Sequence, residues 1–287
     1  MQWEGREESE NVEDTRGMGG GGRGLMIGGG GVVGVIVVIL GLIFGVDVGK
    51  FRGGGGGPAP DGPAGPRDPD EDRMAKFSKV IFRDTEVVWD QQFAKLNKRY
   101  DKPVLRLFTD QVDTRCGPAD SGVGPFYCPA DSRVYIDLSF FEVLERDLKS
   151  GGEFARAYVI AHEVGHHVQR LLGYSARVDQ ARQRGSKREA NEMSVRLELQ
   201  ADFLAGVWAH HGQKQFNFLE PGDIESATNA AYHIGDDYLQ KRSGRRPVPE
   251  SFTHGTSAQR QRWFMDGFKT GDVRRAALLF DMPYNQL

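Results

Sequence analysis

The spacing of apolar residues divides the chain into a short alternating region and several longer helical regions. Between residues 72 and 97, apolar side chains recur every three or four positions, which is the period of an amphipathic helix. The stretches VLRLFT, after Pro103, and SRVYIDLSFF both alternate apolar and polar positions, as strands with one buried face do. We therefore expect a small sheet in the first half of this region.

Helical patterns dominate the rest of the chain. FEVLERDL predicts a short helix that Gly151 and Gly152 end, and Gly173 closes a long helix that starts at residue 153. Further helices are expected at residues 188–212, 222–242, 257–271 and 273–280. Together these patterns predict an α+β domain that is mostly helical.

The first 72 residues differ in composition from the remainder. Of the 38 glycines, 22 lie within the first 73 positions. Residues 1–24 are polar, charged and glycine-rich, so we expect them to be disordered. Residues 25–48 include the uncharged run from Leu25 to Val46, which is about 33 Å long as a helix and would cross a hydrocarbon core of roughly 30 Å. A transmembrane helix is therefore predicted there, followed by a Gly/Pro linker at 49–72 and a folded domain at 73–287.

Two cysteines indicate the compartment in which the predicted domain lies. Cys116 and Cys128 have a spacing that suits a loop-closing disulfide, the alternative being two buried thiols. A disulfide forms in an oxidising compartment such as the bacterial periplasm. Basic residues are nearly balanced on the two sides of the predicted span, so the cysteines decide its orientation. We expect a single-pass protein of the bacterial inner membrane with a cytoplasmic N-terminus and a periplasmic domain.

Charge and glycine spacing indicate which partners to expect. The net charge of −3 gives no overall basic field, which argues against nucleic acid. Gly30-x-x-x-Gly34 and Gly41-x-x-x-Gly45 have the spacing with which two spans could pair in a homodimer.

The long helix carries polar groups in an otherwise apolar sequence. HEVGH places His162 and His166 one turn apart on one helix face, where two imidazoles can bind a single zinc ion. Glu163 lies beside the first of them, where it can act as base toward a zinc-bound water of pKa about 7. Burying these groups without a cation would be costly, so we interpret the motif as a site for one Zn2+ rather than as a chance string. His167 lies about 100° around the helix and is expected to be hydrogen-bonded in the core.

A catalytic zinc site needs a third protein ligand and an open fourth position. Glu198 is the preferred third ligand, because it lies in a helix among apolar neighbours. Asp202, one turn further on, could accept a ring N–H from a ligand histidine. Glu192, and His210 and His211 at a helix end, remain alternatives.

Hydrolysis also needs a hydrogen-bond donor at the developing oxyanion. His254, in a loop between helices, is the first candidate for this catalytic role. The further candidates are Tyr232, His233 and Arg260. Thr256 or Ser257 is expected to cap the next helix. The predicted strand Arg133–Asp137 could pair along its edge with an extended peptide substrate.

HEVGHHVQ followed by ELQADFLAGVWAH resembles the neutral zinc metallopeptidase family of bacteria. RCGPADSGVGPFYCPADSRVYIDLSFF, IGDDYLQ and PESFTHGTSAQRQRWFMDGF are similar to other characteristic stretches of that family. More distantly, the pattern resembles the gluzincin proteases, which implies a zincin-like domain. The resemblance implies that the zinc ligands are His162, His166 and Glu198. It also implies that Glu163 is the base and that Asp202 is the hydrogen-bond partner of a ligand histidine. Phe203, where family members often have cysteine, is expected to face the core.

The leading hypothesis is a membrane-anchored, zinc-dependent endopeptidase acting on a protein or peptide substrate. One alternative is a metal-stabilised, non-proteolytic binding or scaffold module of the cell envelope, and another is hydrolysis of a non-protein amide such as a cell-wall peptide. Glu163 argues against the scaffold, since a structural zinc site needs no such carboxylate and fills all four positions with protein ligands.

Overall fold

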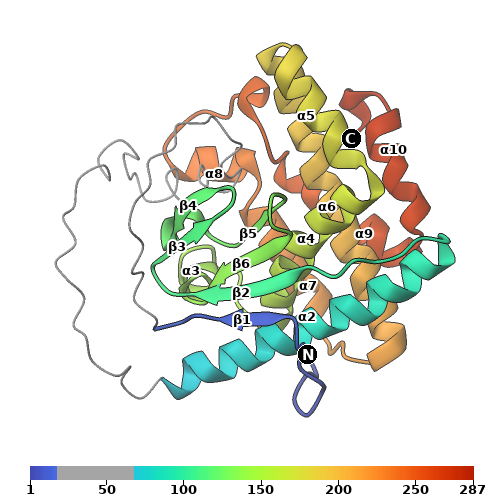
Figure 1. Cartoon of the computed structure of the whole chain (residues 1–287). Helices are drawn as coiled ribbons and strands as arrows, with labels where there is room; N and C mark the ends of the chain where they lie inside the picture. Colours follow the sequence, from blue (N-terminus) through green and yellow to red (C-terminus); the bar gives the residue numbers. More distant parts are fainter. Residues whose placement is uncertain (18–67) are drawn as a thin grey trace.

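The computed structural model describes residues 1–17 and 68–287 (Figure 1). Its strands lie on one side of the molecule, and a larger group of helices lies on the other. The predicted class, α+β and mostly helical, is confirmed. The predicted transmembrane segment 25–48 and residues 49–67 of the predicted linker lie outside the described residues. Among the helices that are described, none has the length and apolar character needed to cross a membrane.

The larger sheet has the strand order β1-β2-β6-β5. Its strands β1 (Val12–Asp14), β2 (Val104–Phe108) and β6 (Arg133–Asp137) are parallel, and β5 (Phe126–Cys128) pairs antiparallel with β6. A separate antiparallel pair is formed by β3 (Gln111–Thr114) and β4 (Gly117–Asp120). The prediction that Arg133–Asp137 offers an edge is wrong, because β6 lies between β2 and β5. Within the described residues, β1 and β5 are the edges of this sheet.

Residues 1–17 belong to the fold, so the prediction of disorder over 1–24 is wrong for this part. β1 pairs with β2, and the Trp3 side chain is 3% exposed and packs edge-on against Phe77, with ring centroids 5.4 Å apart. Glu13 forms ion pairs with Arg106 at 2.9 Å and with Arg133 at 2.7 Å. Composition misled here because the apolar and charged groups of this segment find partners 55 or more residues away in the sequence.

The described helices include those that the apolar periodicity predicts and one more, at Tyr174–Arg184, that was not predicted from the sequence. They are α2 (Pro69–Lys95), α3 (Ser139–Arg146), α4 (Glu153–Leu172), α5 (Tyr174–Arg184), α6 (Lys187–Phe216), α7 (Asp223–His233), α8 (Asp236–Arg242), α9 (Ser257–Thr270) and α10 (Leu278–Asp281). Because α2 begins at Pro69, residues 69–72 are helix rather than linker. The helix predicted at 222–242 is interrupted at Ile234 and Gly235, and the one predicted at 273–280 begins as a 3-10 helix.

Helices α6 and α9 cross at backbone contact. A Cβ atom added to Gly206 would lie 2.1 Å from the carbonyl oxygen of Phe264, and one added to Gly267 would lie 2.0 Å from that of Phe203. Neither position can therefore carry a side chain at this separation. Phe203 is fully buried, as expected. The close crossing brings the polar side chains of the two helices within direct reach of one another.

Cys116 and Cys128 form the predicted disulfide, with their Cα atoms 5.9 Å apart. It closes the segment that holds β4 and β5, and β3 ends just before it. Under it lies a small apolar cluster of buried residues, separate from the main core, made of Phe108, Val112, Val123, Phe126, Cys128 and Tyr135.

Candidate metal centre

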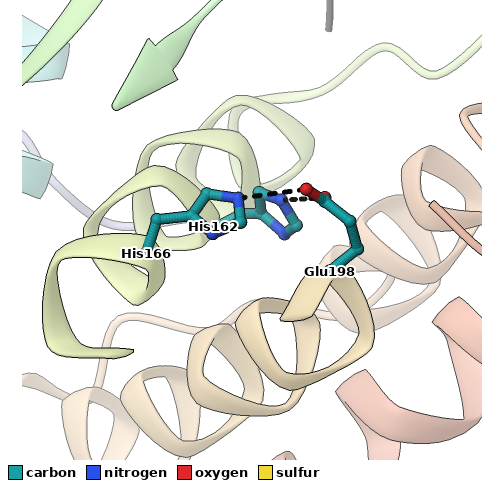
Figure 2. Close-up of side chains that lie close together, drawn as sticks. All are labelled: His162, His166 and Glu198. Carbon is teal, nitrogen blue, oxygen red and sulfur yellow. Dashed lines mark hydrogen bonds and ion pairs between the residues drawn. The ribbon is translucent and has the colours of Figure 1, made fainter. Parts of the chain in front are cut away.

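Two helices bring three potential metal ligands together (Figure 2). His162 and His166 lie one turn apart on α4, and Glu198 faces them from α6. The Nε2 atom of His162 is 3.2 Å from Oε2 of Glu198, and the Nε2 atom of His166 is 3.6 Å from Oε1. One ligand atom from each of the three residues lies within 4.8 Å of the others. Tetrahedral ligands at zinc distances are about 3.3 Å apart, so this separation suits one ion.

The hydrogen bonds of the two rings fix which nitrogen faces the third ligand. Nδ1 of His162 lies 2.8 Å from Oδ1 of Asp202, and Nδ1 of His166 lies 2.8 Å from Oε1 of Gln169. Both Nδ1 atoms therefore donate when the rings are neutral, which leaves an Nε2 lone pair pointing toward the Glu198 carboxylate. Lone pairs and an anion repel one another unless a cation lies between them. The donor set thus fits a divalent ion that prefers nitrogen and oxygen ligands, as zinc does.

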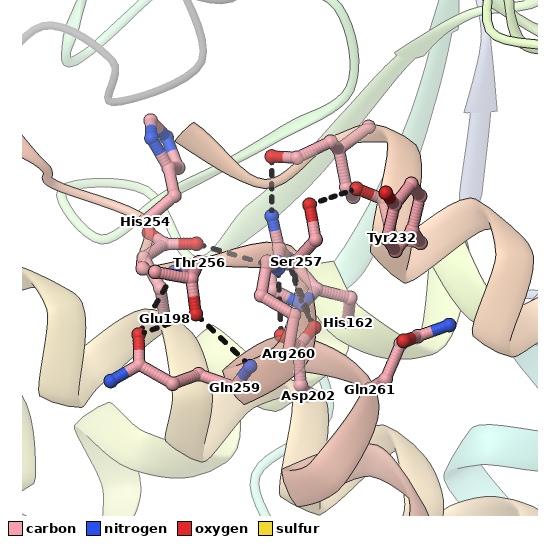
Figure 3. Close-up of polar contacts among 12 residues, drawn as sticks. His162, Glu198, Asp202, Tyr232, His254, Thr256, Ser257, Gln259, Arg260 and Gln261 are labelled. Atoms are coloured by element: carbon pink, nitrogen blue, oxygen red, sulfur yellow. Dashed lines mark hydrogen bonds and ion pairs between the residues drawn. The ribbon is translucent and has the colours of Figure 1, made fainter. Parts of the chain in front are cut away.

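Asp202 is the centre of a buried polar network behind the ligands (Figure 3). Besides His162, it accepts the hydroxyl of Tyr158 at 2.5 Å and two hydrogen bonds from Arg260, at 2.7 Å from Nε and 2.9 Å from Nη2. Arg260 is 1% exposed although it carries a full charge. Burial alone would raise the pKa of Asp202, but Arg260 outweighs it and keeps the pKa low. Asp202 therefore remains an anion that can orient the His162 ring.

Burial and the neighbouring charged groups shift the pKa values of all three potential ligands. Burial would raise the pKa of Glu198, but His166 and His162 hold it below its usual range. Burial lowers the pKa of His166 to about 4. For His162 burial also acts downward, yet Asp202 and Glu198 together raise its pKa to about 9. Without a metal, a proton is therefore favoured on His162, chiefly because of the Asp202 carboxylate behind its ring and also because of Glu198.

Glu163 faces the same space as the ligands. It is 2% exposed and, with His162, Glu198 and Arg260, lines a cavity of about 40 Å3. The apolar walls of this cavity are Pro125, Phe140, Val159 and Ile234. Burial raises the pKa of Glu163 to about 8, and a hydrogen bond from the backbone of Tyr127 in β5 acts in the opposite direction. A carboxyl of this kind is basic enough to take up a proton near neutral pH.

His254 lines the cavity from the loop before α9. Asp236 holds this loop, since its Oδ2 atom accepts the backbone N–H groups of Thr253, His254 and Gly255, at 2.7, 2.7 and 3.1 Å. Its Oδ1 atom lies 3.0 Å from Nδ1 of His254. The His254 ring is 1% exposed, and its Nε2 atom has no hydrogen-bond partner within the described part of the chain. That nitrogen is free to bind a ligand in the cavity. Thr256 caps α9, as predicted.

Several other predicted candidates lie elsewhere. Glu192 pairs with Arg188 at 2.9 Å, and His210 and His211 bind the carbonyl oxygens of Phe268 and Gly271. The exposed Tyr232 and its neighbour His233 do not line the cavity. His167 is hydrogen-bonded in the core, as expected, between the Tyr127 hydroxyl and the carbonyl oxygen of Asp101.

Sequence reasoning missed three supporting residues: Tyr158, Gln169 and Asp236. Tyr158 precedes His162 by one turn, and Gln169 follows His166 by three residues, so helical spacing places both on the ligand face. Spacing could therefore have indicated these two. Asp236 lies 18 residues before His254 across a loop, and no local pattern joins them.

The site geometry agrees with the comparisons to known proteins. Residues 1–277 match the family described as "Putative neutral zinc metallopeptidase". The chain belongs to this family. It is 49% identical over 284 residues to the uncharacterized protein YpfJ of Escherichia coli (strain K12), covering 95% of this chain and 96% of that protein. It is 50% identical over 183 residues to the uncharacterized protein Rv2575 of Mycobacterium tuberculosis (strain ATCC 25618 / H37Rv), covering 60% and 61% of the two chains. No solved structure matches the chain significantly.

Proposed function

We propose that this member of the family is a zinc-dependent endopeptidase. The observation that carries the proposal is the convergence of His162, His166 and Glu198 on one point beside a cavity that Glu163 and His254 also line. Two nitrogen ligands, one carboxylate and an open side are typical of a catalytic zinc site rather than of a structural one. The family name points in the same direction.

The chain's own residues have separate parts in this proposal. His162, His166 and Glu198 would hold the ion, which supplies a Lewis acid and an activated water when it is bound. Glu163 accepts the proton of the attacking water and passes it to the leaving amine, because its raised pKa suits both steps. The apolar walls of the cavity limit the access of bulk water.

His254 is the proposed donor to the developing oxyanion. Asp236 accepts from its Nδ1 atom, so the protonated ring can direct Nε2–H into the cavity. Arg260 lines the same cavity, but its guanidinium is already held by Asp202. We therefore assign Arg260 to positioning rather than to substrate contact.

The test is metal analysis paired with a protease assay on the full-length protein in detergent. Wild type should contain about one zinc per chain and cleave casein or a fluorogenic peptide, and a chelator should stop the cleavage. Glu163→Gln should retain the zinc and lose hydrolysis, whereas Glu142→Gln, at an exposed position of α3, should match wild type. Full activity in Glu163→Gln would refute the role of the base. Zinc without hydrolysis in wild type would favour the non-proteolytic module.

His254→Ala separates the donor from the base. We expect kcat to fall about 100- to 1000-fold with zinc content unchanged, as when an oxyanion donor is removed elsewhere. His233→Ala is the matched control, because this histidine does not line the cavity. An unchanged kcat in His254→Ala would remove His254 from the reaction.

Attachment to the bacterial inner membrane through residues 25–48, a periplasmic domain and pairing of spans as a homodimer remain proposals. The disulfide supports an oxidising compartment. Residues 25–48 lie outside the described part of the chain.

A further inference from the structure

Residues 1–17, here called the N-terminal segment, are held to residues 68–287 by buried polar contacts along their whole length. Near its start, the backbone N–H of Gln2 donates to the carbonyl oxygen of Phe218, and near its end that of Thr15 donates to the carbonyl oxygen of Leu107, at 2.8 and 2.9 Å. Between these points β1 adds a parallel strand to the edge of β2. The segment is therefore one layer of the domain rather than a tail that rests on it.

Helix α2 carries two buried carboxylates that bind residues of the segment, and one of them, Glu86, also pairs with Arg83 of the same helix at 3.2 Å. Glu86 is 1% exposed and accepts the Ser9 hydroxyl at 2.8 Å and the Asn11 amide at 2.7 Å. Asp84, also buried, forms an ion pair with Arg6. Burial raises the pKa of Asp84 to about 7, although the charge of Arg6 acts to lower it. The segment thus supplies partners to carboxylates that are buried in the folded protein, where a charge without such partners would be strongly destabilising.

Arg16 fastens the other end of the segment to the start of α2. Its guanidinium is buried and contacts Glu71 at 3.2 Å and Asp72 at 3.1 Å, as well as Asp14 within the segment. The end of the segment, just before the gap, and the first turn of α2 after it are thus joined directly.

We propose that the N-terminal segment and residues 68–287 lie in the same compartment. A single crossing by residues 25–48 would put the segment and the domain on opposite faces of a membrane, where β1 could not pair with β2. Any membrane attachment through residues 18–67 must therefore return the chain to the face from which it started. This inference depends on contacts far from the metal centre, so it stands or falls separately from the proposed activity.

Cysteine accessibility in the full-length protein tests the proposal. Glu8→Cys in the segment and Gln183→Cys on α5 replace exposed side chains, and the native cysteines are joined as a disulfide. Each variant is expressed in bacteria and treated with a membrane-impermeant maleimide, in intact spheroplasts and after permeabilisation. The unsubstituted protein gives the background, and labelling in detergent shows that both new thiols react.

The two thiols should respond alike. If both react in intact spheroplasts, or if both react only after permeabilisation, the shared compartment is supported. If one reacts in intact spheroplasts and the other only after permeabilisation, the proposal is overturned and a single crossing is established.

Cross-linking shows whether β1 is in place in the membrane-bound protein. Glu13 and Arg106 are opposite one another in the β1–β2 register, so cysteines at both positions should form a disulfide after oxidation of isolated membranes. The pair Glu13→Cys and Gln183→Cys should not. Mass spectrometry of the joined peptides provides the readout. No cross-link at the register pair, in a protein whose native disulfide is intact, would also overturn the proposal.

Discussion

Replacing Asp202 with asparagine tests the link between the buried network and the metal ligands. The change keeps the shape of the side chain but removes its charge. The amide oxygen can still accept from one neighbour, whereas the amide nitrogen would then face donors of Tyr158 or Arg260. The buried guanidinium of Arg260 thereby loses the carboxylate that holds it at 2.7 and 2.9 Å.

Two magnitudes follow from this geometry. Removing one partner of a fully buried ion pair costs about 3–5 kcal/mol of the free energy of unfolding. Loosening the hydrogen bond that orients a ligand histidine typically weakens metal affinity about 10- to 100-fold. We therefore expect Asp202→Asn to be less stable by about 3–5 kcal/mol without zinc, and to bind zinc about 10- to 100-fold more weakly.

Competition with a chromophoric chelator measures the zinc affinity, and urea unfolding of the zinc-free protein measures stability. Asp84→Asn is the matched control, because it removes a buried carboxylate from an arginine partner far from the cavity. It should lose stability and keep the zinc affinity of wild type. If Asp202→Asn binds zinc as tightly as wild type while remaining folded, Asp202 does not orient the ligand.

Three further predictions concern the frame around the site. Gly267→Ala forces a methyl group against the carbonyl oxygen of Phe203, so the α6–α9 crossing must widen. We expect the free energy of unfolding in urea to fall by about 1–3 kcal/mol and zinc binding to weaken. An unchanged urea midpoint would contradict the close crossing. Burial lowers the pKa of His167 to about 4, so as the pH falls below about 6.5 its imidazole is protonated in the unfolded state before the folded one. The free energy of unfolding should therefore decrease by up to about 3 kcal/mol between pH 6.5 and 4. His167→Gln should flatten that pH dependence in unfolding curves of the zinc-free protein. Replacing Cys116 and Cys128 together with serine opens a loop with a sequence separation of 12, which should cost about 3 kcal/mol in calorimetry, and no loss would mean that the loop is already ordered in the unfolded chain.

The parts of the site that the sequence predicted are those encoded within a single helix. His162 and His166 share a face because they are four residues apart, and Glu198 and Asp202 do so for the same reason. Where two helices meet is not a local property. The pairing of Arg260 with Asp202 depends on a crossing at two glycines, and sequence spacing gives no sign of it.

The N-terminal segment shows the opposite limit. Its composition is that of a disordered chain, and no apolar period marks β1 as a strand. Its order comes from partners such as Glu86 and Leu107, which lie 75 or more residues away. A rule based on local composition therefore predicts disorder where long-range contacts produce a buried strand.

The pairing of β1 with β2 also means that β1 must wait during translation until β2 has been made. Glu13 leaves the ribosome 93 residues ahead of its partner Arg106, which at about 5–20 residues per second corresponds to a delay of about 5–20 s. During that interval β1 waits for β2, the strand with which it pairs. β1 is thus made well before the strand that it joins in the sheet, and a chaperone that binds extended polypeptide would find its target there.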